Sequence, residues 1–210
     1  MLIDHVGMAF FPQHLQFRII GRLAFPLFAW LIANGFKHTK NVYKYLGRLI
    51  VLALISQYPF QLFMGINNQP PTHLNIFFTL ALGLSALIIS TSKMGKLIKT
   101  GSILFLLIIA EIFQVDYGMF GILSILVFHK FYSQHLKTFF FQVLVWSLSL
   151  IYSFLTTFGN SINLNILSVF SIFFIKSYNL QPGKAHKWLF YGFYPAHLLV
   201  IYLIKLAVAS

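Results

Sequence analysis

The chain has 210 residues, of which 59% are hydrophobic and only 9% charged, and this composition excludes an ordinary soluble domain. Fifteen Lys and Arg residues accompany only three acids, Asp4, Glu111 and Asp116, so the net charge is +12. The basic residues are dispersed and form no stripe, which favours membrane-protein loops over nucleic-acid binding. The absence of cysteine excludes disulfides, thiolate metal ligands and a cysteine nucleophile.

Apolar runs follow one another along the whole chain. After a short amino-terminal segment there are eight, which cover residues 19–36, 46–65, 74–91, 100–115, 118–133, 138–155, 163–176 and 188–208. Because an α-helix needs about 20 residues to cross a bilayer, the pattern predicts an all-α polytopic membrane protein with about eight transmembrane helices. No stretch has the composition of a linker or a soluble module, so residues 1–210 are predicted to form a single transmembrane domain.

The amino-terminal segment, residues 1–12, is too short to cross a bilayer. It carries Asp4 and His5 inside an apolar stretch. We expect a short helical segment at the outer end of the bundle, which is either a half-helix or the remaining part of a truncated first helix.

The connections between the eight runs alternate in charge. Lys and Arg residues mark the first, third, fifth and seventh connections, around residues 37–48, 93–99, 130–137 and 176–187. The connections between them have no Lys or Arg, and the fourth holds only Asp116. Because cytoplasmic loops are rich in Lys and Arg, we predict that the basic connections face the cytoplasm and the others face outward.

Two local features modify this pattern. The fourth and fifth runs meet at residues 116–118 with almost no loop, which predicts a tight helical hairpin at the outer face. Pro26, Pro59 and Pro195 lie inside helical runs. Proline removes a backbone donor and can kink a helix, so these positions either leave carbonyl groups for neighbours and substrate or serve packing alone.

With this topology, most polar groups of the apolar runs gather in the outer half of the bundle. They are Asp4, His5, Arg22, Asn75, Thr79, Glu111, Asp116 and Tyr117. Arg22 and Glu111 each lie about one turn from the outer end of a run. An unpaired charge beside hydrocarbon is costly, so we expect mutual pairing and treat the three acids as functional candidates.

Two interpretations of these groups stay open. In the first, a carboxylate such as Asp4 orients the imidazole of His5, which then accepts a proton. In the second, Arg22 and a carboxylate hold two helices together, and His5 only makes a hydrogen bond. Adjacent residues of a helix point in different directions, so Asp4 need not touch His5.

His197 is the second histidine inside an apolar run, and it follows Tyr194 and Pro195. It is either a buried, hydrogen-bonded side chain or an alternative base. The other histidines lie in or near the connections without the spacing of metal ligands, so no metal site is predicted.

Several motifs resemble the TraX family of membrane proteins. They lie at residues 3–12, 20–29, 35–41, 45–49, 56–60, 74–83, 116–121 and 193–198, and they include IDHVGM, IGRLAFPLFA, DYGMFG and FYPAHL. The resemblance covers nearly the whole chain. Family members carry a longer apolar stretch before the Asp-His motif, which agrees with a truncated first helix.

The resemblance implies a multi-pass acetyltransferase of the bacterial cytoplasmic (inner) membrane, similar to the enzyme that acetylates the amino terminus of F-type pilin. It also implies a relation to membrane acyltransferases that use acyl-CoA from the cytoplasmic side. The expected partners are therefore the lipid bilayer, acetyl-CoA as acyl donor and an extracytoplasmic protein or glycan as acceptor, with no nucleic acid and no metal.

As a mechanism, we expect the loop cations Lys37, Lys40 and Arg48 to attract the phosphates of acyl-CoA. His5, oriented by Asp4 or Glu111, would deprotonate the acceptor, and His197 is the alternative base.

The remaining candidates would bind the acceptor. Arg22, Asn75 or Tyr117 would position it or stabilise the oxyanion, and Thr79, Asp116 and Tyr194 complete the expected substrate-binding set. Two rivals remain. Intramembrane acids, histidines and arginines also serve proton-coupled transporters, and the chain could act as a non-catalytic factor in the assembly of surface structures.

Overall fold

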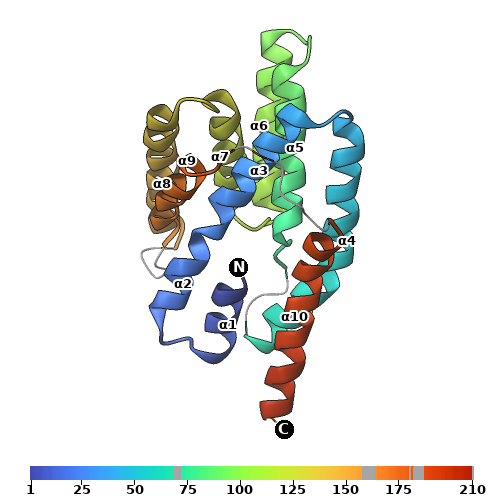
Figure 1. Ribbon diagram of the computed structural model, residues 1–210, viewed down its shortest axis with the longest axis vertical. Helices are drawn as coiled ribbons and strands as arrows, with labels where there is room; N and C mark the ends of the chain where they lie inside the picture. Colours follow the sequence, from blue (N-terminus) through green and yellow to red (C-terminus); the bar gives the residue numbers. More distant parts are fainter. Residues whose placement is uncertain (69–71, 158–163, 180, 182–186, 210) are drawn as a thin grey trace.

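The computed structural model describes residues 1–68, 72–157, 164–179, 181 and 187–209 (Figure 1). The secondary structure is α1 (Leu2–Phe10), α2 (Leu15–Arg22), α3 (Ala24–His38), α4 (Val42–Ile66), α5 (Ile76–Thr91), α6 (Lys96–Ile112), α7 (Gly118–Lys130), α8 (His135–Thr157), the 3₁₀ helix η1 (Leu164–Phe170), α9 (Ser171–Lys176) and α10 (Lys187–Ala209). No β-strand forms within these ranges, so the all-α prediction is confirmed for them.

Four helical segments are long and apolar enough to cross a membrane. They are Leu15–His38, Val42–Ile66, His135–Thr156 and Tyr191–Val208. The other predicted runs contain shorter helices, such as the 16 residues of α5 and the 13 of α7. Length and composition therefore support four of the expected eight spans, and a crossing by the shorter helices stays a prediction.

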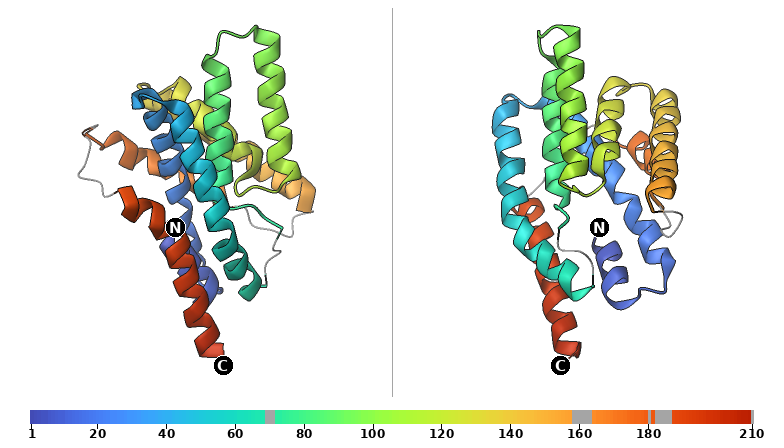
Figure 2. Two further views of the ribbon diagram at one scale, coloured as in Figure 1. Left: turned by 90° about the vertical axis from the view of Figure 1, so that its right-hand side faces the viewer. Right: turned by 180° about the vertical axis from the view of Figure 1, so that it is seen from behind.

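The middle of the bundle is occupied by α5, which contacts α3, α4, α6 and α7. Its buried residues include Leu84 and Leu87, which are fully enclosed, as is Ile125 of α7. The last helix, α10, packs along α4 and also contacts α1, so the first and last helices of the chain lie against each other (Figure 2). A short amino-terminal helical segment, α1, forms as expected and packs against α2.

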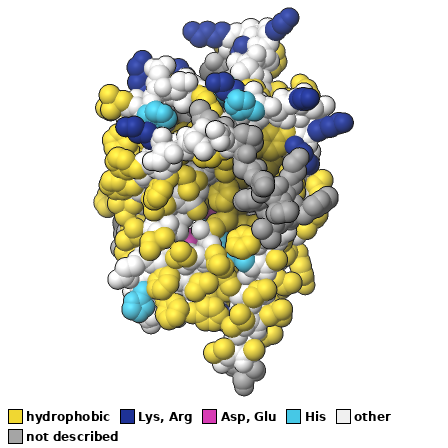
Figure 3. Space-filling model, viewed as in Figure 1, with side chains coloured by type: hydrophobic (Ala, Val, Ile, Leu, Met, Phe, Trp, Pro, Cys, Tyr) yellow, Lys and Arg dark blue, Asp and Glu magenta, His cyan; other side chains and the backbone are white. Residues whose placement is uncertain are grey.

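The connections α3–α4, α5–α6 and α7–α8 all lie at the upper end of the molecule (Figure 1). The Lys and Arg side chains visible in Figure 3 gather at that end, above a broad belt of hydrophobic side chains. Three of the four basic connections thus share one end, as alternation predicts, whereas the side of the membrane that this end faces stays a prediction. Parts of the sixth and seventh connections, including Lys184, lie outside the described residues.

The α6–α7 hairpin forms, but its connection lies at mid-height rather than at the far end of the molecule (Figure 1). The cause is the shortness of α5, α6 and α7, which all begin or end there. A parallel β-bridge between Leu74 and Val115 joins this connection to the residues before α5. The connection is therefore held inside the bundle, where its side chains are available to a site.

The prolines behave differently from one another. Pro59 and Pro195 lie within continuous helices, α4 and α10. Pro26 lies in the first turn of α3, where a missing N–H group costs little, and the helix is interrupted just before it, between Arg22 and Ala24. This interruption sets the direction of Arg22, the last residue of α2.

Candidate functional site

Two histidines from opposite ends of the sequence form a direct pair. Nδ1 of His5, on α1, lies 2.8 Å from Nε2 of His197, on α10, and the two rings stack with centroids 5.0 Å apart. Both side chains are buried, and Phe63 and Tyr194 contact the ring of His5. The two histidines that the sequence offers as alternative bases are thus parts of one unit.

The hydrogen bonds indicate how the protons are arranged. Nδ1 of His197 lies 2.7 Å from the carbonyl oxygen of Phe193, which can only accept, so this nitrogen carries a hydrogen. In neutral His197 the Nε2 atom is then an acceptor, and Nδ1 of His5 must donate to it. This assignment follows from the network and leaves Nε2 of His5 without a hydrogen, as a base requires.

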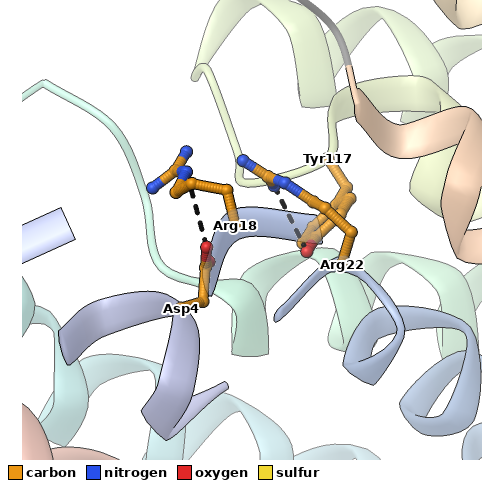
Figure 4. Close-up of polar contacts among 4 residues, drawn as sticks. All are labelled: Asp4, Arg18, Arg22 and Tyr117. Carbon is orange, nitrogen blue, oxygen red and sulfur yellow. Dashed lines mark hydrogen bonds and ion pairs between the residues drawn. The ribbon is translucent and has the colours of Figure 1, made fainter. Parts of the chain in front are cut away.

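Two arginines of α2, Arg18 and Arg22, contact Asp4 and Tyr117 (Figure 4), and all four residues share a cavity with His5. Nε of Arg18 is 3.5 Å from Oδ1 of Asp4, and both side chains are mostly buried. A terminal nitrogen of Arg22 donates to the hydroxyl of Tyr117 over 3.4 Å, and the guanidinium lies 5.7 Å from the centre of that ring. The structure thus pairs Asp4 with Arg18, where the sequence suggested His5 or Arg22.

These groups surround a cavity of about 240 Å³ between α1, α2, α4 and the α6–α7 connection. The side chains with polar groups around it are Asp4, His5, Arg18, Arg22, His73, Asp116, Tyr117 and Tyr194. Nε of Arg22 is buried and has no hydrogen-bond partner among the described residues, and Oδ1 of Asp4 is buried with only the ion pair to Arg18. A cavity with a base, a guanidinium and unsatisfied polar atoms has the composition of a reaction site for a polar group.

The backbone brings these side chains together through close approach and one unusual turn. A Cβ atom on Gly21 would overlap the Asp4 side chain, so only glycine lets α2 pack this closely on α1. Tyr117 adopts a left-handed conformation (φ 65°), which is uncommon for a residue other than glycine. The turn aims its ring into the core, where it stacks on Phe25 at 3.9 Å.

Two predicted substrate-binding residues have structural contacts instead. Asn75 is fully buried, caps α5 by accepting from the N–H of Phe77, and donates to the carbonyl of Ala53 and to Gln57. The hydroxyl of Thr79 donates to the backbone carbonyl of Asp116. Asn75 therefore satisfies the backbone at the start of α5, and Thr79 satisfies the backbone of the buried turn at Asp116, as such positions require.

Glu111 lies away from the histidine pair. One carboxylate oxygen accepts from the N–H of Met119 at 2.7 Å, and the other accepts from the Tyr152 hydroxyl at 3.3 Å. Its charge therefore stabilises the amino terminus of α7. The expectation that Glu111 orients His5 does not agree with these contacts, since His197 has that place.

The three predicted phosphate-binding cations are spread over the basic end. Lys37 lies over the ring of Tyr132 at 4.1 Å, and Arg48 lies 5.7 Å from the centre of the Tyr45 ring. Lys40 is exposed in the α3–α4 connection. None of them lines the cavity around His5.

The sequence interpretation missed Arg18 and His73 as residues of the cavity. Arg18 precedes Arg22 by four residues, so both occupy one face of a helix, and this spacing was a usable signal. His73 reaches the cavity only because the bridge between Leu74 and Val115 fixes its position. No local pattern could indicate that.

A family model described as TraX protein matches residues 1–205. The chain belongs to the TraX family. The membership and the apolar helices together make it a membrane protein.

One curated relative of this TraX-family chain is the probable fimbrial assembly protein FimC, serogroup H1, of Dichelobacter nodosus. The two are 30% identical over 145 residues, which is 64% of this chain. The chain spans about three-fifths of the relative's length, since the match covers 59% of it. No solved structure matches the chain.

Proposed function

We propose that this TraX-family protein is a multi-pass acetyltransferase of the bacterial cytoplasmic membrane. It transfers an acetyl group from acetyl-CoA to an extracytoplasmic amine, such as the amino terminus of a pilin-like protein. The observation that carries the proposal is the His5–His197 pair, whose free nitrogen belongs to a ring that lines a polar cavity. The name of the relative, a probable fimbrial assembly protein, supports a pilus-related acceptor.

In the proposed reaction, the acceptor nitrogen attacks the thioester carbonyl and a C–N bond forms. Nε2 of His5 takes the proton that the nitrogen loses, while the hydrogen bond to His197 orients the ring and shares the resulting charge. The C–S bond then breaks, and the proton passes to the leaving thiolate. The products are the acetylated amine and free CoA.

Arg22 and Tyr117 are suited to the charge that develops on the carbonyl oxygen. The Tyr117 hydroxyl accepts from Arg22, which leaves its own O–H group free to donate. A guanidinium and a polarised hydroxyl, held in place before the reaction, stabilise an oxyanion without reorganisation. Asp4 neutralises Arg18 beside them.

The test is an acetylation assay with the purified full-length protein, labelled acetyl-CoA and a pilin-derived acceptor, read by mass spectrometry of the acceptor. We expect His5→Ala and His197→Ala to reduce turnover by about 10²- to 10⁴-fold, the range typical of a lost general base. His135→Ala, at an exposed histidine of α8, is the matched control and should stay near wild type. Full turnover in both pair variants would exclude the mechanism.

A second candidate function is a non-catalytic role in fimbrial assembly, which the name of the relative favours. It predicts lost fimbriae in a deletion strain without any change in acceptor mass, and normal fimbriae with His5→Ala. The transporter alternative predicts ion-driven uptake into proteoliposomes.

A further inference from the structure

A second cavity, which the mechanism above does not use, lies next to the site. Its volume is about 370 Å³, and α3, α4, α5 and α10 enclose it. We call it the apolar chamber; its lining includes Phe28, Leu49, Leu80 and Tyr191 and contains no charged side chain among the described residues. Met1, Ile76 and Tyr194 line both the chamber and the cavity around His5, so the two adjoin.

On its other side the chamber adjoins a surface groove of about 580 Å³ along α4. Tyr191 lines both of them. The groove has an apolar wall that includes Val51 and Ile55, and two exposed cations, Lys44 and Arg48, belong to it. Arg48 also lies over the ring of Tyr45, and Tyr45 lines the chamber. Groove, chamber and site cavity thus lie next to one another in a row.

The row has a clear order of chemical character. It begins with two cations near the basic end, continues through a chamber of aromatic and aliphatic side chains, and ends at the histidine pair. Along α4, Arg48 and Phe60, which lines the site cavity, are separated by a rise of about 18 Å. A ligand that fits this row has an anionic head, a long uncharged arm and a reactive group at the far end of that arm.

We propose that this row is the binding path of the acyl donor, with the uncharged arm of acetyl-CoA inside the apolar chamber. Lys44 and Arg48 bind its phosphates, and the thioester reaches the cavity beside His5. This assignment rests on the proposed acetyl transfer. It moves the expected phosphate contacts from Lys37 and Lys40 to Lys44, while Arg48 keeps its role.

The natural absence of cysteine allows a direct test by labelling, because any introduced thiol is unique. Leu80→Cys places a thiol on the wall of the chamber, where Leu80 is 4% exposed. Leu54→Cys, on the outward face of α4 at 63% exposure, is the matched control. Both full-length variants are treated with N-ethylmaleimide in detergent, with and without an unreactive thioether analogue of acetyl-CoA that has no free thiol.

We expect the analogue, at ten times its dissociation constant, to slow labelling of Leu80→Cys about tenfold, because the unoccupied fraction falls in that proportion. The Leu54→Cys rate should not change. The nucleotide head alone, 3′-phosphoadenosine diphosphate, should not protect Leu80→Cys. Unchanged labelling with the analogue, or protection by phosphatidylglycerol vesicles in its place, would overturn the proposal.

Kinetics provide an independent measurement that does not depend on the chamber variant folding. Arg48→Gln should raise the KM for acetyl-CoA at least several-fold and leave the KM for S-acetylpantetheine, which has no phosphates, unchanged. Lys137→Gln, an exposed lysine at the same end, is the control. Equal effects of Arg48→Gln on both donors would contradict a phosphate contact.

The two proposals fail in different ways. Donor protection of Leu80→Cys without acetylation of any amine would exclude the proposed function and keep the binding path. Acetylation that needs His5, with no protection and no change in donor KM, would keep the function and exclude the path.

Discussion

At the scale of single residues, the central feature of the site is the pair of histidines, His5 and His197, which differ in their hydrogen-bond partners. The backbone carbonyl of Phe193 fixes the proton of His197, and His197 in turn fixes the proton of His5. Of these two histidines, His5 lines the cavity and His197 does not. In the proposed mechanism His5 therefore accepts the proton, and His197 positions its ring as a carboxylate does in catalytic triads.

This division of tasks predicts different outcomes for two substitutions at one position. Glutamine at position 197 can still accept a hydrogen from Nδ1 of His5, whereas leucine cannot. We expect His197→Gln to keep a larger share of kcat than His197→Leu, which should approach the loss seen with His5→Ala. Initial rates at saturating acetyl-CoA measure the effect, and equal rates for the two variants would contradict the orienting role.

A second residue-scale prediction concerns the contact between α1 and α2. Gly21→Ala should destabilise the protein by about 1–3 kcal/mol, the usual cost of overpacking, because the new methyl group overlaps Asp4. Gly47→Ala is the control, since nothing lies near its added Cβ and alanine favours a helix. Thermal unfolding in detergent compares them. A Gly21→Ala variant as stable as the wild type would show that α1 can move away freely.

At the scale of elements, the cavity lies where helices are short or interrupted. Arg22 ends α2, Tyr117 precedes α7, and Asp116 belongs to the connection held by the Leu74–Val115 bridge. In a membrane, backbone groups outside regular helices need partners within the protein. The contacts of Asn75 and Thr79 supply such partners, which explains why these polar residues are buried without lining the cavity.

The capping role of Asn75 can be measured against a simpler cap. Asn41→Ala removes one exposed cap, the bond from the N–H of Lys44, and should cost about 1 kcal/mol. Asn75→Ala removes a cap and also the buried side-chain hydrogen bonds to Ala53 and Gln57, so we expect a further loss of about 1–3 kcal/mol. Chemical denaturation of both variants tests the difference. Equal losses would mean that water satisfies the freed groups.

At the scale of the whole molecule, the arrangement of charge predicts orientation. Lys40 lies in the α3–α4 connection at the basic end, and Gln13 lies in the α1–α2 connection at the opposite end (Figure 1). In intact spheroplasts a membrane-impermeant maleimide should label Gln13→Cys and spare Lys40→Cys until the membrane is permeabilised. The reverse pattern would invert the topology.

The sequence predicted the helices well because apolar runs and basic connections are local signals. It also identified most of the polar side chains around the cavity, since charges rarely occur in apolar runs without a task. It did not predict which of these side chains contact one another. Whether His5 meets Asp4 or His197 depends on how α1 and α10 pack, and that contact spans 192 residues. The contacts of Glu111 were not predictable either, because a charge pattern does not reveal a hydrogen bond to the backbone of Met119.

The pairing of the first and last helices also has a consequence in time. His5 is synthesised near the start of the chain and His197 near its end. The ring of His5 can therefore be oriented by His197 only after α10 has packed against α1 and α4. A chain that stalls, is clipped or inserts incompletely therefore lacks the pair. If the proposed acetyl transfer takes place, only molecules whose helices are all assembled would consume acetyl-CoA.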